Sequence, residues 1–199
     1  MPMLVHKDKV IVLKQNRFSE TDLIVRVLNQ KGALLSFIAK GAVKSRKRFT
    51  GGVLEPGHFI GVEYKHSRRS SLHFLCQAWF LKRFENLRRD YDRLQLALHF
   101  LSLIEKISQE GVEDSPELFH LLGNSLKALE TSNHLPALQF IFEFRLLLSQ
   151  GVLPPELQTQ EFLFFITIKE HEQLLRYIPF VKKWSTLVRT TLDHYVCGR

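Results

Sequence analysis

The stretch that decides the fold is KQNRFSETDLIVRVLNQKGALLSFIAKGAVKSRKRFTGG, residues 14–52. Two runs in it alternate between apolar and other residues, which is typical of half-buried β-strands. The residues that share a face are Leu23, Val25 and Val27 in the first run and Leu35, Phe37 and Ala39 in the second. A turn at 29–32 joins the runs, and its last residue, Gly32, can adopt a positive φ. The stretch therefore predicts a β-hairpin followed by a basic loop.

The basic loop carries Lys44, Arg46, Lys47 and Arg48, with no acidic residue between Asp22 and Glu55. These charges repel one another, and a phosphate backbone would relieve that repulsion and release counterions. Phe49 beside them could stack on a base. A solvated surface loop is the plain alternative. Nucleic-acid binding is favoured because more cations lie in neighbouring segments, namely Arg17, Arg26, Lys40, Arg68 and Arg69.

The charge of the chain is strongly asymmetric. Residues 1–80 hold 14 Lys and Arg against 5 Asp and Glu, a net of +9, whereas residues 81–199 hold 14 against 15, a net of −1. The whole excess of the formal +8 therefore sits in the first part. Such a split points to a polyanion-binding module joined to a near-neutral one.

Three more strands are predicted in the first part, at 9–14, 58–64 and 72–79. Five short strands without a long helix among them fit a small barrel, and the OB-fold is a five-stranded form that binds oligonucleotides. An SH3-like barrel is the alternative on pattern alone. We therefore expect an α+β chain, with an OB-fold nucleic-acid-binding domain over 1–80 and an all-α domain for packing and partner binding over 81–199.

The second part has helical periodicity. A stripe on the first helix, which we expect to end near Gly111, is formed by Leu87, Tyr91, Leu94, Leu98, Leu101 and Ile104. Further helices are expected from Ser115-Pro116, after Asn133, and over 162–175 and 180–197. Phe140, Phe142 and Phe144 alternate along one helix and cannot all face one side, so at least one should meet another helix or a partner.

Several functions find no support in the sequence. Neither GxxxxGK[ST] nor GxGxxG occurs, and no nucleophile–base or carboxylate pair stands out, so no enzyme, no catalytic residue and no cofactor is expected. Cys76 and Cys197 are too few for a disulfide framework or a zinc site, which suggests a reducing, cytoplasmic setting. No apolar run approaches the roughly 20 residues that span a membrane, and no secretory signal is recognisable.

An ordered series of short motifs resembles the RecO family of bacterial recombination mediators. In the first part these are RFSETD (17–22), LIVR (23–26), QKGA (30–33), AKGA (39–42), SR (45–46) and LEP (54–56). In the second they are ELFHLL (117–122), RLLL (145–148) and GVLPP (151–155). Many members carry four zinc-binding cysteines shortly after the last motif. Residues 156–164, ELQTQEFLF, have none, so no metal is expected.

The resemblance implies an N-terminal OB-fold and a helical C-terminal domain. It also implies binding of single- and double-stranded DNA, annealing of complementary strands coated with single-strand-binding protein, and cooperation with RecR in loading the RecA recombinase near the bacterial nucleoid. The family's basic positions correspond to Lys40, Lys44, Arg46, Lys47 and Arg48, and less closely to Arg17 and Arg26. The helical domain of the family receives the acidic, apolar tail of single-strand-binding protein, for which Phe142, Phe144 and Arg145 are candidates here.

Two other functions stay open at this point. OB barrels also bind RNA, so an RNA-binding module is one alternative. A scaffold whose basic face meets an acidic protein surface is the other.

Overall fold

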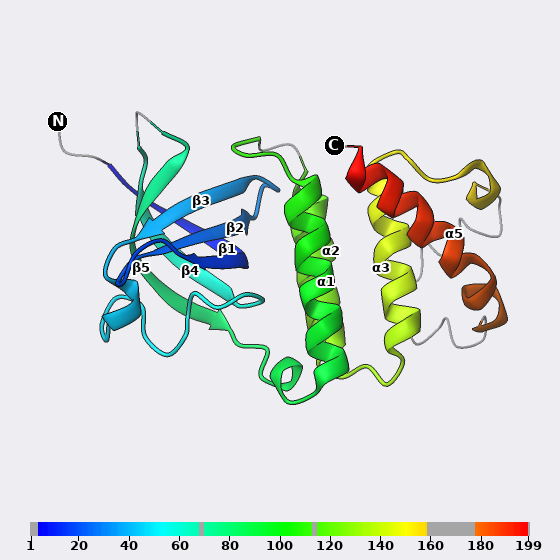
Figure 1. Cartoon of the computed structure of the whole chain (residues 1–199), viewed down its shortest axis with the longest axis horizontal. Coiled ribbons are helices and arrows are strands. Elements are labelled where there is room, and N and C mark those ends of the chain that lie inside the picture. The colour runs from blue at the N-terminus through cyan, green and yellow to red at the C-terminus, as the bar shows by residue number, and fades with distance from the viewer. Residues whose placement is uncertain (1–3, 68–69, 113–114, 159–177, 199) are drawn as a thin grey trace.

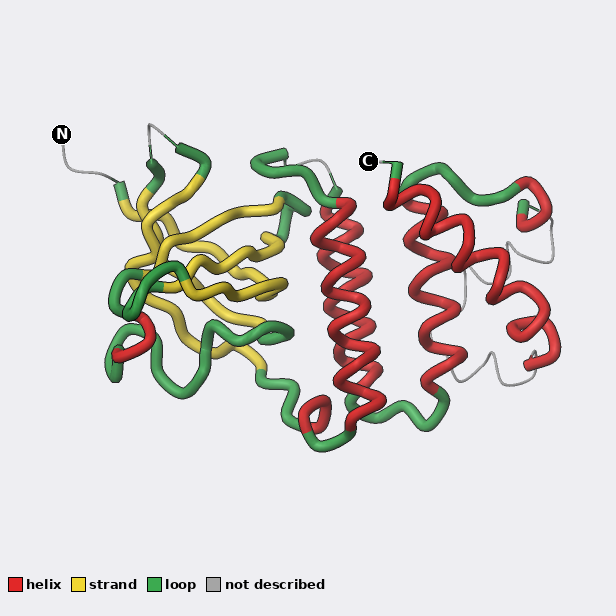
Figure 2. The backbone as a smooth tube through the Cα atoms, viewed as in Figure 1, coloured by secondary structure: helices red, strands yellow, loops and turns green. Residues whose placement is uncertain are grey.

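The structure is a computed structural model, which describes residues 4–67, 70–112, 115–158 and 178–198. A β-barrel comes first in the chain, and a group of helices follows it (Figures 1 and 2). Helices α1 (Tyr91–Ile107) and α2 (Pro116–Leu129) overlap in the view of Figure 1 and lie between the barrel and the helices α3 (Leu135–Ser149) and α5 (Ile178–Cys197). The expected α+β organisation, an OB-like barrel followed by helices, is confirmed.

Five strands form the barrel: β1 (Val5–Arg17), β2 (Leu23–Asn29), β3 (Leu34–Ala39), β4 (Phe59–Lys65) and β5 (Leu72–Lys82). They close in the order β1-β2-β3-β5-β4, and β4 pairs back with β1. All pairs are antiparallel except β3 with β5, where Phe37 lies opposite His73. The long strand β1 pairs with β4 through its first half and with β2 through its second, so one bent strand closes the ring.

The predicted strand faces are confirmed. All six alternating residues of the hairpin are buried in one cluster inside the barrel. Asn29, itself buried, holds the turn because its Oδ1 accepts hydrogen bonds from the backbone N–H groups of Lys31 and Ala33 at 3.0 and 2.9 Å. Gly32 follows at φ 85°. The expected strand at 9–14 is longer in the structure, because its ends find partners on two different strands.

The helices are α1, α2 (Pro116–Leu129), α3 (Leu135–Ser149) and α5 (Ile178–Cys197), with short 3-10 turns at Asn86–Arg88 and Pro155–Leu157. Asp90 caps α1, since its side chain accepts the N–H of Arg93 at 3.1 Å. Ile11 and Leu13 of β1 belong to the same hydrophobic cluster as the helices. The barrel and the helices thus share a core.

The stripe predicted on α1 is partly wrong. Tyr91 is 78% exposed and Leu98 is also exposed, whereas Leu96, Ala97 and Phe100 are buried. A single stripe describes a helix that packs on one side. Because α1 packs against β1 and also against α2, α3 and α5, its buried surface is broader and rotated relative to the stripe.

None of the helices in the described part of the chain combines the length and the apolar character that crossing a membrane would require.

Candidate nucleic-acid interface

The turn between β1 and β2 supports the start of the basic loop. Asp22 Oδ1 accepts the backbone N–H of Gly41 at 2.8 Å and the hydroxyl of Thr21 at 2.9 Å. The carbonyl of Thr21 accepts the N–H of Val43 at 3.0 Å. The Gly41 N–H, helped by Thr21, lowers the pKa of Asp22. The RFSETD and AKGA motifs therefore meet, and the Asp22 carboxylate is bonded to the backbone at the start of the loop.

The basic loop, defined here as residues 40–52, has a hydrogen-bonded framework. Its chain forms a 3-10 turn at Ala42–Lys44, after which Ser45 Oγ accepts the N–H groups of Arg48 and Phe49 at 3.2 and 3.3 Å. Arg48 donates through Nη2 to the carbonyl of Lys40 at 2.7 Å, and its own carbonyl accepts the N–H of Ala78 of β5 at 3.1 Å. These bonds fix the loop to the barrel.

Phe49 is buried, so the expectation that it could stack on a base is wrong. Its ring is only 5% exposed and belongs to the core of the barrel, with the guanidinium of Arg48 at 5.1 Å from the ring centroid. An apolar ring is stabilised by burial, and the bond between the Arg48 carbonyl and Ala78 of β5 holds the loop close to the barrel core, where burial is available. Phe49 therefore anchors the loop and leaves the cations outside.

The structure brings most of the predicted cations together. Lys40, Lys44, Arg46, Lys47 and Arg48 are exposed on the loop, and none of them forms an ion pair with a carboxylate in the part of the chain described here. Arg17, at the end of β1, lies beside the loop, because it lines a hollow of about 310 Å³ with the loop residues Ala42, Ser45 and Gly51, and with Glu55. We call these six residues the cationic cluster.

Arg26 is placed elsewhere. Its guanidinium donates to Glu105 of α1 at 2.7 Å, and Lys14 approaches the same carboxylate at 3.9 Å. Arg26 thus connects the barrel to the helices and is not part of the cationic cluster. Arg68 and Arg69, in the loop between β4 and β5, lie outside the described residues.

Sequence reasoning missed two exposed aromatic rings near the cationic cluster. Phe18 in the β1–β2 turn is 61% exposed, and Phe74 of β5 is 40% exposed, with Lys40 Nζ 5.6 Å from its ring centroid. For Phe74, the alternation along β5 could have indicated exposure. The next residue, Leu75, is buried, so Phe74 faces outward.

The residues suggested for partner binding are mostly in the core. Phe142 is fully buried and stacks on Phe100 of α1 with ring centroids 3.9 Å apart, and Phe144 is buried as well. Both rings of this alternating pair are covered because α3 packs against α2 on one side and α5 on another. Arg145 is partly buried, and burial lowers the pKa of its guanidinium. The two phenylalanines therefore present no surface to a partner.

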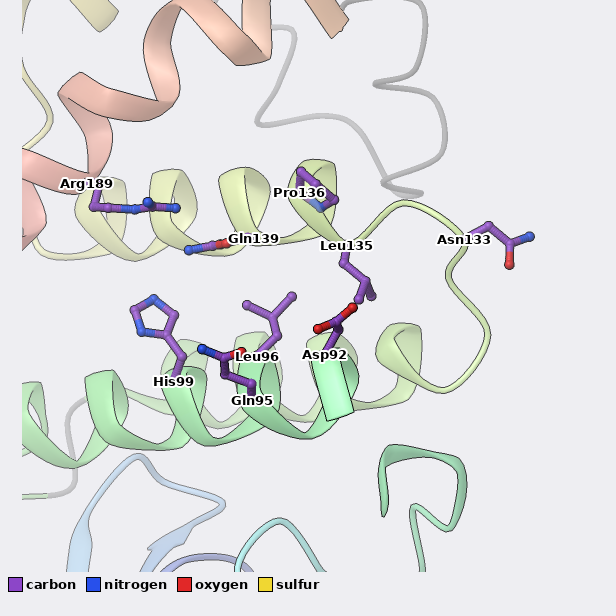
Figure 3. Close-up of a pocket in the computed structure, with 9 residues that line it drawn as sticks. All are labelled: Asp92, Gln95, Leu96, His99, Asn133, Leu135, Pro136, Gln139 and Arg189. Carbon is purple, nitrogen blue, oxygen red and sulfur yellow. The ribbon is translucent and has the colours of Figure 1, made fainter. Parts of the chain in front are cut away.

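A cleft of about 670 Å³ lies instead between α1, α3 and α5. Figure 3 shows His99 of α1, Gln139 of α3 and Arg189 of α5 at one end, and Asp92 and Leu135 toward the other. His99 Nε2 lies 2.8 Å from Oε1 of the buried Glu143, which also accepts from Gln139 Nε2 at 2.7 Å. The cleft combines apolar walls with polar groups from three helices.

Just after the basic loop, Glu55 and His58 contact Arg88, which lies in the 3-10 turn before α1. The carboxylate of Glu55 pairs with Arg88, and Arg88 Nη2 donates to His58 Nε2 at 3.1 Å. His58 is buried, and its Nδ1 has no hydrogen-bond partner among the described residues. Burial, reinforced by the positive charge of Arg88, lowers the pKa of His58 to about 4. The imidazole is therefore neutral at neutral pH and accepts from Arg88.

Within the described residues, no group of three His, Cys, Asp or Glu side chains is arranged to bind a metal ion. The stretch in which the absence of zinc ligands was noted lies largely outside those residues.

Comparisons with known proteins agree with this architecture. The family model "Recombination protein O N terminal" matches residues 3–84, and "Recombination protein O C terminal" matches residues 88–157. The chain is 34% identical over 151 residues to a protein named DNA repair protein RecO from Syntrophus aciditrophicus, covering 75% of this chain and 57% of that protein. It is 34% identical over 128 residues to the protein of the same name from Rubrobacter xylanophilus, covering 64% and 50%.

A third relative of that name, from Alkaliphilus metalliredigens, is 30% identical over 149 residues, which is 74% of this chain and 59% of the relative. The matches thus span between 50% and 59% of the relatives' length. Both family models, the ordered motifs and the OB-like barrel with its helical extension lead to one conclusion: the chain belongs to the RecO family.

Proposed function

We propose that this chain is a non-catalytic DNA-binding mediator in DNA repair that anneals complementary strands and helps to load the recombinase onto DNA coated with single-strand-binding protein. The observation that carries the proposal is the cationic cluster, because its exposed positive charges form no ion pair with a carboxylate of the described residues and lie on or beside a hydrogen-bonded loop. Fixed cations of this kind release condensed counterions when they meet phosphates. Membership of a family whose relatives are named DNA repair proteins supports the same role.

Annealing would follow from the same charges. Two strands held near one cationic surface repel each other less, so their bases can search for complements. Figure 1 shows the segment that follows β3 at the end of the barrel away from α5. In the proposed division of labour, residues 1–80 bind single- and double-stranded DNA, and residues 81–199 bind protein partners in the cytoplasm, next to the nucleoid.

The proposed partners are RecR and the C-terminal tail of single-strand-binding protein. For the tail, the cleft between α1, α3 and α5 is a better candidate than the buried Phe142 and Phe144. Arg189 offers a guanidinium that can bind a carboxylate, while Leu96, Leu135 and Pro136 provide apolar walls for a hydrophobic side chain.

The test is a triple variant, Lys44→Ala, Arg46→Ala and Lys47→Ala, titrated with a labelled single-stranded oligonucleotide. Its matched control removes the same charge from exposed positions on the helices, Lys106→Ala, Lys127→Ala and Lys182→Ala. We expect the triple variant to lose at least about tenfold in affinity and to reduce the salt slope by about 2, at roughly 0.7 per phosphate contact. Equal binding by the triple variant, the control and the unaltered chain would show that DNA binds elsewhere.

A further inference from the structure

We propose that Phe74 is a base-stacking residue, so that the interface recognises an unstacked base as well as phosphates. The inference rests on the proposed nucleic-acid function of the cationic cluster. It adds recognition of an unstacked base, which single strands offer and duplexes do not. Aromatic rings beside a cationic groove bind successive bases of single strands because each base has a π-face.

The position of Phe74 follows from the pairing of β5. Ile38 of β3 lies opposite Phe74 in the parallel pair, so the ring stands on the outer surface of the sheet where β3 ends and the basic loop begins. The next residue, Leu75, points into the barrel and is buried. With 40% of its surface exposed, Phe74 is held by the strand while its ring stays accessible.

A chain of contacts joins this ring to the cationic cluster. Lys40 Nζ lies 5.6 Å from the Phe74 ring centroid, and the Lys40 carbonyl accepts a hydrogen bond from Arg48 at 2.7 Å. A nucleotide whose phosphate meets Lys40 would therefore place its base within reach of the ring. The ammonium of Lys40 can contact phosphate while its stem lies beside the ring. Phe49, the ring that the sequence suggested for stacking, is buried and cannot take this part.

Other exposed aromatic rings lack this combination. Tyr91, at the start of α1, is 78% exposed but belongs to the helical part. Trp79 also lies on the outer face of β5, but its indole covers Gly61 of β4, where an added Cβ would come within 2.3 Å of the ring. Phe18 follows Arg17 and is 61% exposed, but it lies in a turn and not on a strand. Among the exposed aromatic rings of the described residues, Phe74 is the one whose ring lies near the charged group of a residue in the cationic cluster.

The experiment separates stacking from phosphate binding by removing the bases from the ligand. Labelled (dT)8 and an eight-unit abasic strand with the same phosphates are titrated with the unaltered chain, Phe74→Leu, Phe74→Trp and the control Tyr91→Leu. We expect Phe74→Leu to weaken (dT)8 binding at least about fivefold and to leave abasic binding unchanged, since one stacked base contributes about 1–3 kcal/mol. Phe74→Trp should retain the preference for (dT)8, and Tyr91→Leu should match the unaltered chain.

Three outcomes would overturn the inference: an equal loss on both ligands, no loss on either, or failure of Phe74→Trp to retain the preference. The triple variant of the cationic cluster, measured in parallel, distinguishes this failure from failure of the function. If the triple variant loses binding but Phe74→Leu affects (dT)8 and the abasic strand equally, only the assignment of Phe74 as the stacking residue is wrong. If neither variant changes binding, the nucleic-acid interface itself is misplaced.

Discussion

The arginines of this barrel differ in exposure and in the group that each guanidinium meets. Arg26 binds the carboxylate of Glu105, Arg48 binds the carbonyl of Lys40, and Arg46 points into solvent. A cation that already has an acidic partner gives little to a phosphate, because the incoming phosphate must replace an existing ion pair. At the scale of residues, therefore, the proposed function assigns DNA binding to a charge by the partner of that charge and not by its residue type.

A matched pair of variants tests this distinction. Arg46→Ala should weaken binding to a single-stranded oligonucleotide and reduce the salt slope by about 0.7, with unchanged stability. Arg26→Ala should lower the free energy of unfolding by about 1 kcal/mol and leave the salt slope unaltered. Anisotropy titrations and urea denaturation of both variants measure the two effects. A larger fall in the salt slope for Arg26→Ala than for Arg46→Ala would contradict the assignment.

His58 gives a prediction on pH. Its folded-state pKa of about 4 lies below the ordinary 6.5, so the unfolded chain binds the extra proton first as pH falls. The contribution of His58 to stability is therefore complete above pH 6.5 and is lost as pH decreases toward 4, by at most about 3 kcal/mol. His58→Gln keeps an acceptor for Arg88 but does not titrate. Denaturation at pH 7.5 and 5.0 should show a smaller difference for this variant, and an equal difference would refute the prediction.

At the scale of elements, the hairpin could be predicted from sequence because its information is local. The alternation of Leu23, Val25 and Val27 requires one buried face, and Gly32 permits the turn. The fates of Phe49 and Tyr91 could not be predicted in this way, since they depend on which elements cover the end of the barrel and the two sides of α1. The same holds for the candidate site: the cluster of cations was visible in sequence, but the ion pair of Arg26 with Glu105 links residues 79 positions apart.

The turn at Gly32 packs against Ser115, which precedes α2. Substitutions at Gly32 and at Gly151 test this contact. Gly32 has φ 85°, and a Cβ there would lie 2.1 Å from the carbonyl oxygen of Ser115 before α2. Gly151 has a similar φ of 68° with nothing within 4 Å of an added Cβ. Gly151→Ala should cost about 1–2 kcal/mol for the backbone alone, and Gly32→Ala about 3 kcal/mol or more. Similar losses in thermal or chemical denaturation would show that the turn does not pack on Ser115 in solution.

At the scale of the whole molecule, the proposed DNA surface and the cleft belong to different parts of the chain. The cationic cluster lies on the barrel, and the cleft lies among α1, α3 and α5 (Figures 1 and 3). The proposed function uses this separation, because a mediator has to hold DNA while it contacts the protein that coats it. The sequence reflects the same separation, because residues 1–80 have a net charge of +9 and residues 81–199 a net charge of −1.

Separate sites predict separable defects. Arg189→Ala should weaken binding of a labelled acidic peptide that ends in an apolar residue by about fivefold or more, and should leave oligonucleotide affinity unchanged. The triple variant of the basic loop should show the reverse. Loss of both activities in either variant, with stability retained, would mean that the two surfaces are not independent.

The most direct test of the central claim is the affinity of the unaltered chain for a labelled single-stranded oligonucleotide, measured by fluorescence anisotropy over a series of salt concentrations. Six residues form the cationic cluster, so the account predicts a steep loss of affinity with salt and a log–log slope of about −2 to −4, at roughly 0.7 per phosphate contacted. A slope near zero, or no binding at low salt, would contradict the claim that this loop holds a nucleic-acid backbone.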